Sequence, residues 1–201
     1  AHELEKVSRG VTPKPSDVFA AVRGVHQRIK GSYAVIALIA GHGLLAFRDP
    51  FGIRPLCVGK GEAGFMVASE SVALEGSGFE LERDVQPGEA LFIDLQGNIA
   101  FESCAQNVRH HPCIFEYVYL ARPDTVIDRV SVYEARLAMG ELLAEKVKAT
   151  IPVDEIDVVI PIPDSSRPSA MQLAHALGIH FRGGFVKNRY VGCTFIMPGQ
   201  A

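Results

Sequence analysis

Residues 156–167 read Ile156-Asp157-Val158-Val159-Ile160-Pro161-Ile162-Pro163-Asp164-Ser165-Ser166-Arg167. The first five residues predict a short buried strand, which the two prolines end. The serines that follow open a helix, which runs to about Leu177 and ends at Gly178. Upstream, Ser131-Val132-Tyr133-Glu134 is a capping box that predicts the start of another helix. The order helix, strand, polar loop and helix is typical of an α/β fold with a parallel sheet.

The first half of the chain predicts strands that are connected locally. Ser16 is placed to cap a helix whose apolar positions are Val18, Val22, Val25 and Ile29. A hairpin follows, with strands at Tyr33–Ile39 and Leu44–Phe47 around Gly41-His42-Gly43. Further strands are expected at Leu56–Val58, Phe65–Ala68 and Ala90–Ile93. The change of pattern between the halves places a domain boundary near residue 100.

Composition excludes several classes of protein. The 201 residues carry 20 Lys and Arg against 23 Asp and Glu, a net charge of −3, so no overall basic field attracts nucleic acid or an anionic membrane. No apolar run approaches the roughly 20 residues of a membrane helix. The four cysteines show no paired spacing, and Cys104 and Cys113 around His110 and His111 do not match a structural zinc site. A cytoplasmic protein is therefore expected.

The loop after the second-half strand is a candidate phosphate site. At the carboxyl end of a strand, the N–H groups of the next helix favour an anion, and the hydroxyls of Ser165 and Ser166 can bind phosphate or magnesium. From Ser165 to Ala201 the chain has no Asp or Glu, but it has four cations, Arg167, Arg182, Lys187 and Arg189. Two alternatives to phosphate binding stay open. The serines could only cap the helix, and the basic segment could be a solvated loop.

In the first half, two local features could be structural. Asp49 and Arg54 flank the turn Asp49-Pro50-Phe51-Gly52 and could form an ion pair. Ser69-Glu70-Ser71 could cap a short helix at Val72–Leu74. No nucleophile with an adjacent base is identified from spacing, so the residues alone leave the chemistry open.

Two segments of the first half are similar to the later part of a class II glutamine amidotransferase domain, Phe47-Arg48-Asp49-Pro50-Phe51-Gly52-Ile53-Arg54-Pro55-Leu56 and Ala68-Ser69-Glu70-Ser71-Val72-Ala73-Leu74. The match continues through Arg83–Ala90. Three segments of the second half, Phe115–Asp124, Ile160–Ser166 and Gly184–Gly192, resemble the glutamine phosphoribosylpyrophosphate amidotransferases. The resemblance covers nearly the whole chain.

This resemblance implies a fold and an activity. Residues 1–100 would be the later part of an N-terminal-nucleophile glutaminase domain with α-β-β-α layers. Residues 101–201 would be a linker and the first part of a type I phosphoribosyltransferase domain with a parallel sheet. The family converts glutamine and phosphoribosylpyrophosphate to phosphoribosylamine, glutamate and pyrophosphate, the first step of purine biosynthesis. One Mg²⁺ per transferase site, purine nucleotides as feedback inhibitors and a homotetramer are also implied, but no iron–sulfur cluster, nucleic acid or membrane partner.

The resemblance also implies roles for individual residues. Asp164, Ser165 and Ser166 would form the pyrophosphate loop, with Ser166 at the magnesium. Lys187, Arg189 and Tyr190 would begin a loop that closes over phosphoribosylpyrophosphate. Tyr119 matches a tyrosine at the interface between the two active sites. Cys113 lies where some members have an iron–sulfur ligand.

The chain also departs from the family pattern. It begins with Ala1, whereas the family's nucleophile is an N-terminal cysteine, and the glutamine-binding arginine and oxyanion segment would lie upstream. The acidic pair that holds ribose and metal would lie downstream, and Cys193 stands where the family has arginine. We therefore expect an interior segment, with no complete catalytic site and no activity by itself.

Two other functions stay open. A non-catalytic regulator with a phosphoribosyltransferase fold would need no glutaminase strands, so the first half counts against it. A different class II amidotransferase, such as asparagine synthetase, would share the first-half motifs. The loop Lys187-Asn188-Arg189-Tyr190 counts against that second alternative.

Overall fold

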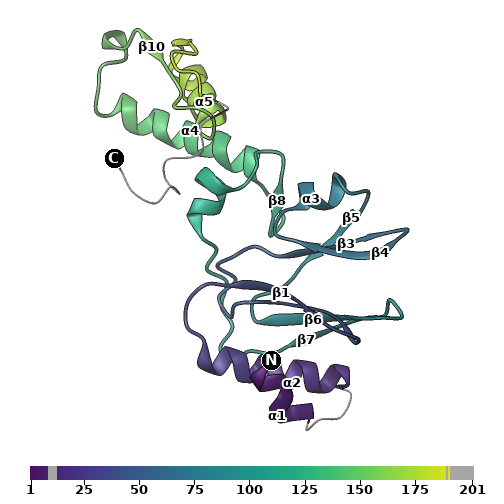
Figure 1. Cartoon of the computed structure of the whole chain (residues 1–201). Coiled ribbons are helices and arrows are strands. Elements are labelled where there is room, and N and C mark those ends of the chain that lie inside the picture. Colours follow the sequence, from purple (N-terminus) through teal and green to yellow (C-terminus); the bar gives the residue numbers. More distant parts are fainter. Residues whose placement is uncertain (9–12, 189, 191–201) are drawn as a thin grey trace. The chain divides into compact units, whose positions relative to one another are not determined.

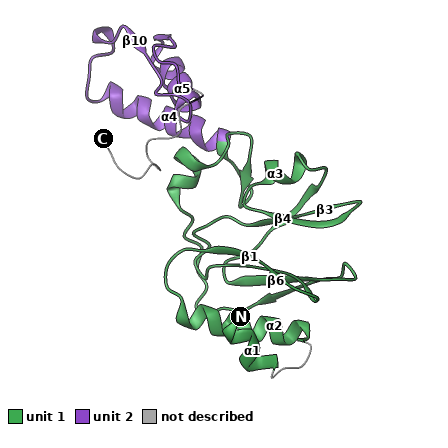
Figure 2. Cartoon of the chain, in the orientation of Figure 1, with its two compact units in different colours: residues 1–132 green, residues 133–201 purple. Residues whose placement is uncertain are grey.

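The structure is a computed structural model and describes residues 1–8, 13–188 and 190. The chain divides into two compact units, residues 1–132 and residues 133–201 (Figure 2). Among the described residues, no helix has the length and apolar character needed to cross a membrane.

The two main sheets of unit 1 are antiparallel (Figure 1). The larger has the order β1-β2-β6-β7 and is built from Ala34–Ile39, Gly43–Arg48, Glu89–Asp94 and Ile99–Ser103. The smaller has the order β4-β3-β5 and is built from Gly64–Ala68, Cys57–Gly61 and Glu80–Asp84. The helices of this part are α1 (His2–Ser8), α2 (Pro15–Arg28) and α3 (Ser71–Glu75).

Alternating side chains of these strands build three hydrophobic layers. On β2, Leu45 and Phe47 pack against Val22 of α2, while Ala46 between them faces the smaller sheet. On β3, Val58 lies between the two sheets, and its neighbour Cys57 packs on the other side with α3. Because a strand's side chains alternate between its faces, this pattern places the sheets between two helical layers. The predicted α-β-β-α order is confirmed.

Local details of the first half differ from the sequence prediction. The helix α2 begins at Pro15, and the side chain of Asp17 accepts the backbone N–H of Lys14 at 2.9 Å, so Ser16 is not its cap. The hairpin is as predicted, with Ala34 opposite Arg48 and Ile39 opposite Gly43. The strands β5 and β7 were not predicted, because their sequences, Glu80–Asp84 and Ile99–Ser103, mix charged and apolar residues.

The last part of unit 1 follows β7. It contains the π-helix η1 (Glu116–Leu120) and a two-stranded hairpin of β8 (Val126–Ile127) and β9 (Val130–Ser131). These elements lie in the compact unit that also holds the two sheets. Compactness reflects contacts alone, so the division of the chain into domains 1–100 and 101–201 stays a prediction.

Unit 2 has the predicted βα order. After α4 (Val132–Lys148), whose first residue closes unit 1, come the short 3-10 helix η2 (Val153–Glu155), β10 (Val158–Val159), α5 (Arg167–Leu177) and β11 (His180–Phe181). The two strands are parallel, with Val158 opposite His180. The paired part of β10 is shorter than the predicted strand 156–160. As predicted, α5 ends at Gly178, whose φ of 70° is the left-handed conformation that glycine adopts readily.

Candidate functional site

The predicted pyrophosphate loop lies directly after β10 and before α5. Ser166 stands at the N-cap position of α5, but its hydroxyl donates to the carbonyl of Ile162 and makes no bond to the first turn of the helix. The alternative that this serine caps the helix by its side chain is therefore wrong. Asp164 is 61% exposed at its side chain and lies 3.5 Å from the guanidinium of Arg167. The loop offers oxygen atoms to solvent beside the first turn of a helix.

The segment after β11 begins at the same edge of the sheet. Because β10 and β11 are parallel, both loops leave from their carboxyl ends. The N–H of Arg182 donates to the carbonyl of Val159 at 3.1 Å, and a Cβ at Gly184 would lie 2.7 Å from Ile160. The segment after β11 therefore touches the residue that opens the loop after β10.

The cations and the tyrosine of this second segment lie further along it. Lys187 is exposed, and Tyr190 is 98% exposed. Arg189 and Cys193 lie outside the described residues. No hydrogen bond or ion pair between described residues joins Lys187 to Asp164, Ser165 or Ser166. Within the described residues, the structure thus brings the starts of the two loops together, but it does not join Lys187 to the predicted pyrophosphate loop.

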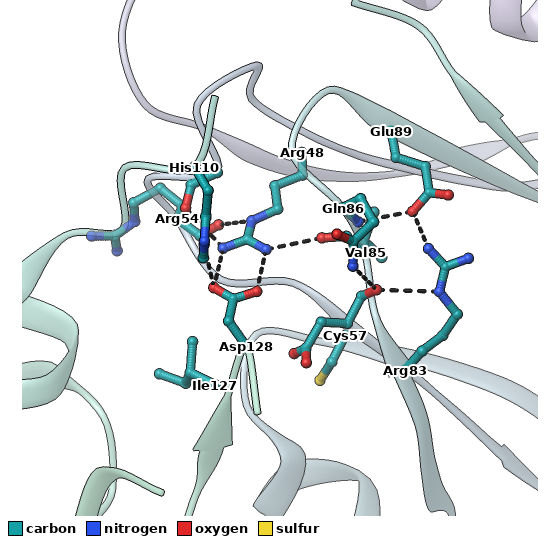
Figure 3. A network of polar contacts seen from close by, with 12 residues as sticks. Arg48, Arg54, Cys57, Arg83, Val85, Gln86, Glu89, His110, Ile127 and Asp128 are labelled. Atoms are coloured by element: carbon teal, nitrogen blue, oxygen red, sulfur yellow. Dashed lines mark hydrogen bonds and ion pairs between the residues drawn. The ribbon is translucent and has the colours of Figure 1, made fainter. Parts of the chain in front are cut away.

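Unit 1 holds a buried polar cluster around Arg48, at the end of β2 (Figure 3). The Arg48 side chain is 1% exposed, and its guanidinium binds both carboxylate oxygens of Asp128 at 2.8 Å. It also donates to three backbone carbonyls, those of Gly52, Arg54 and Val85, at 2.6–2.9 Å. His110 Nε2 lies 3.0 Å from the carboxylate of Asp128. We call Arg48, Asp128 and His110 the Arg48 cluster.

The hairpin β8–β9 delivers Asp128 to this cluster. Asp128 and Arg129 form its two-residue turn and have φ of 49° and 66°, the left-handed pair that tight hairpins require. Their backbone N–H groups also bond to Asp84, at the end of β5. Burial raises the pKa of Asp84, and the charge of Asp128 adds to this rise. Burial opposes the charge of Asp128 as well, but the hydrogen bond and charge of Arg48 hold the pKa of Asp128 below its usual value.

The two carboxyl groups are expected to affect stability in opposite directions with pH. A lowered pKa means that Asp128 stabilises the fold above about pH 4 and loses this contribution as pH falls through its folded pKa. Asp84, whose pKa is raised, contributes stability below about pH 4 and loses it as pH rises through its folded pKa. Urea unfolding between pH 3 and 7 measures both. Asp128→Asn should flatten the acid loss of stability, and Asp84→Asn should steepen it. An identical effect of the two variants would contradict this assignment.

The motif Ser69-Glu70-Ser71 binds a later segment of unit 1. The Ser71 hydroxyl accepts the N–H of Val126 at 2.9 Å and shares a hydrogen bond of 3.1 Å with the Thr125 hydroxyl. Glu70 Oε2 accepts the N–H of Arg122 at 2.9 Å. Glu70 is the N-cap residue of α3, but no side chain makes a cap hydrogen bond there. The predicted capping role is therefore replaced by attachment of residues 122–126.

The turn after β2 also contacts the later part of unit 1. Asp49 is completely buried and accepts the N–H groups of Phe51, Ile53 and Arg54, so its role is to hold the turn. The guanidinium of Arg54 pairs with Glu116 of η1 at 2.8 Å. The predicted ion pair between the side chains of Asp49 and Arg54 is therefore wrong. Both motifs of the first half contact residues 116–128.

The structure gives no metal site among its described residues, 1–8, 13–188 and 190, since no group of three or more His, Cys, Asp or Glu side chains could hold an ion. Cys57 and Cys104 are free and buried, and burial raises their pKa values to about 12 and about 11. Such thiols are poor nucleophiles at neutral pH. Cys113 is free and partly exposed.

Sequence analysis did not identify four residues of unit 1 as members of buried polar contacts: Arg48, Glu116, Thr125 and Asp128. Each of them has a side-chain or backbone partner 54–80 positions away, a separation that no local pattern reveals. The one available signal was an arginine that continues the apolar strand Leu44–Phe47.

Comparison with known proteins identifies the class first. Residues 14–76 match the family model of a glutamine amidotransferase domain. Together with the α-β-β-α layers, this match makes unit 1 a glutamine amidotransferase fold.

Along its whole length the chain is similar to amidophosphoribosyltransferases, which confirms the resemblance inferred from the motifs. It is 56% identical to that of Pseudomonas aeruginosa over 205 residues, covering all of this chain and 41% of the relative. It is 53% identical to that of Escherichia coli, over 92% of this chain and 37% of the relative. The chain thus spans about two fifths of the length of these relatives.

Two solved structures agree. One is described as the allosteric regulatory enzyme of purine biosynthesis and is 35% identical, with a TM-score of 0.80. The match covers 99% of this chain and 40% of the chain in that structure. The other is the glutamine phosphoribosylpyrophosphate amidotransferase of Bacillus subtilis in complex with ADP and GMP. It is 33% identical, with a TM-score of 0.76, and the match covers 99% of this chain and 45% of the chain in that structure.

Proposed function

We propose that the protein carrying this chain is an amidophosphoribosyltransferase. It would use glutamine to convert phosphoribosylpyrophosphate to phosphoribosylamine, glutamate and pyrophosphate, the first step of purine biosynthesis. The observation that carries this proposal is the 56% identity over the whole chain, which includes both compact units. A regulator or an asparagine synthetase would match only one half.

The proposal divides the work between two parts of the chain. Residues 1–100 would be the later part of the glutaminase domain, supported by the layers of unit 1. Residues 101–201 would be a linker and the first part of the phosphoribosyltransferase domain, supported by the parallel arrangement β10–α5–β11. Phosphate ligands of such folds bind beyond the carboxyl ends of the strands.

Asp164, Ser165 and Ser166 would hold the pyrophosphate of the substrate. Their loop precedes the N-terminus of α5, where backbone N–H groups favour an anion. The hydroxyls would donate to phosphate oxygens, and the Ser166 hydroxyl would exchange its bond to Ile162 for the substrate. Lys187, Arg189 and Tyr190 would close over the bound molecule and exclude water, so that ammonia rather than water attacks.

A magnesium ion would fit this loop chemically. Hydroxyl and carboxylate oxygens are the donors that Mg²⁺ prefers, and phosphates of the substrate commonly complete its shell. Ser166 would be its protein ligand, with Asp164 close by in the loop. The ion would neutralise charge on the departing pyrophosphate.

We also propose an interface residue, feedback inhibitors, an oligomeric state and a compartment for the enzyme. Tyr119, on η1, would lie at the interface between the two active sites. Purine nucleotides would act as feedback inhibitors of a homotetramer, and the Bacillus relative with bound ADP and GMP supports the nucleotide part. Three free cysteines among the described residues suit the reducing cytoplasm.

The test uses the complete polypeptide in which these residues occur. Glutamine-dependent loss of phosphoribosylpyrophosphate, with one pyrophosphate and one glutamate formed per turnover, is expected. Ser166→Ala should raise the KM for phosphoribosylpyrophosphate about tenfold, the cost of one charge-assisted hydrogen bond. Thr150→Ala, which removes a hydroxyl in the turn after α4, is the control and should leave the KM unchanged. Consumption of aspartate and ATP instead of phosphoribosylpyrophosphate would overturn the proposal.

A further inference from the structure

We propose that Arg54 and Glu116 are a positioning pair that fixes η1 on the glutaminase part, so that ammonia released from glutamine reaches the transferase reaction rather than water. This inference rests on the proposed function. Neither residue belongs to the predicted phosphoribosylpyrophosphate site.

Glu116 is a buried acid at the first position of η1. The residue is 6% exposed, and its Oε1 lies 2.8 Å from Arg54 Nη1. No hydrogen bond with good geometry reaches that oxygen within the described residues, so the contact with Arg54 is a pairing of charges. Burial raises the pKa of Glu116, Arg54 opposes this rise, and Glu70 adds to it. A buried carboxylate that depends on one cation responds strongly to the loss of that cation.

The backbone of Arg54 is held by hydrogen bonds on the other side of the contact. Its backbone N–H donates to Asp49, and its carbonyl accepts from the buried guanidinium of Arg48 at 2.6 Å. Only the side chain of Arg54 reaches toward solvent, at 43% exposure. The turn therefore fixes the backbone from which the guanidinium of Arg54 reaches η1, so this ion pair links the position of η1 to that of the turn.

The rest of η1 shows what this attachment controls. The N–H of Ala121 closes the π-helix on the carbonyl of Glu116 at 2.9 Å, and the Tyr117 hydroxyl donates to the carbonyl of Ile127 of β8 at 3.3 Å. Val118, Tyr119 and Leu120 are 37–44% exposed. Thus Glu116 and Tyr117 fix the helix on unit 1, and Tyr119 belongs to its exposed apolar part. Single-turn π-helices are rare and are frequent at functional sites.

The chemistry explains why the position of η1 matters. Hydrolysis of the glutamine amide gives glutamate and ammonia. The ammonia nitrogen then forms a bond to the ribose carbon as the bond from that carbon to pyrophosphate breaks. Ammonia that escapes between the two steps takes up a proton in water and is lost as a nucleophile. A shift of η1 at the proposed interface should raise this loss without changing either step by itself.

The experiment compares three activities of the complete protein: glutamate release, ammonium-dependent transfer and glutamine-dependent transfer. Glu116→Gln keeps the shape of the side chain and removes its charge, and Arg54→Met removes the cation. Both should lower glutamine-dependent transfer about fivefold, while glutamate release and ammonium-dependent transfer stay within twofold. Arg54→Lys, which keeps the charge, should restore most of the coupling. Glu89→Gln, which removes the charge of the ion pair with Arg83, is the matched control and should leave glutamine-dependent transfer unchanged.

The outcomes separate the two proposals. If the unchanged protein consumes no phosphoribosylpyrophosphate with either nitrogen source, the proposed function fails. If it does, but Glu116→Gln lowers all three activities equally, or none, the positioning role is wrong. The double variant Arg54→Met with Glu116→Gln should be no worse than either single change, since both remove one interaction.

Discussion

Replacing Arg48 by methionine is expected to lower the free energy of unfolding of unit 1 by about 3–5 kcal/mol. Methionine keeps most of the apolar volume but removes all five hydrogen bonds of the guanidinium. Asp128 would remain as a carboxylate with 12% side-chain exposure, and His110 would be its remaining ion-pair partner among the described residues. Three backbone carbonyls would also lose a donor, and an unpaired buried polar group costs about 1–3 kcal/mol.

Peptide-resolved hydrogen exchange in increasing urea measures this effect, because it reports the stability of each unit separately. Peptides from β2 and β6 should exchange faster in Arg48→Met, whereas peptides from α5 should not change. Arg83→Met is the control, since Arg83 is 36% exposed in its ion pair with Glu89 and such pairs contribute about 0–1 kcal/mol. Equal losses in the two variants would show that the Arg48 cluster does not hold unit 1 together.

Most strands of unit 1 could be predicted from sequence because they depend on local pattern. The strands β1, β2, β4 and β6 are apolar runs with turn residues at their ends, and the hairpin register follows from its turn. The sequence Glu80–Asp84 lacks this pattern, because β5 is an edge strand with exposed side chains. The number of layers came from the family resemblance.

The contacts of the two first-half motifs could not be predicted in the same way. Local reasoning paired Asp49 with Arg54 and made Ser71 a cap, since each had a candidate partner within a few residues. In the structure, Arg54 and Ser71 bind residues 116 and 125–126, and Arg48 binds residue 128. Buried charges and hydroxyls need partners wherever the fold supplies them, and here the later segment supplies all three. This attachment explains why unit 1 extends to residue 132.

The second large effect is expected in unit 2, where Gly140→Ala should lower the free energy of unfolding by about 2 kcal/mol. Gly140 lies in α4, where it faces α5. A Cβ there would lie 2.3 Å from the carbonyl oxygen of Ser169 and 2.9 Å from Cβ of Gln172. Neither atom can move without its helix, and the hydroxyl of Ser169 also bonds to the carbonyl of Arg136 at 2.8 Å. Overpacking costs about 1–3 kcal/mol, and a backbone clash belongs at the upper end, against a helix-propensity gain of about 1 kcal/mol.

The same substitution in α2 should have the opposite sign. A Cβ at Gly24 would meet only the side chain of Glu3, whose carboxylate can rotate away because it belongs to a flexible side chain. Gly24→Ala should therefore stabilise unit 1 by about 0.5–1 kcal/mol through helix propensity. Exchange of α4 and α5 peptides in Gly140→Ala, and of α2 peptides in Gly24→Ala, compares the two. Stabilisation by both changes would mean that α4 and α5 do not approach each other at Gly140. The packing of α5, which follows the proposed phosphate loop, would then differ from the structure described above.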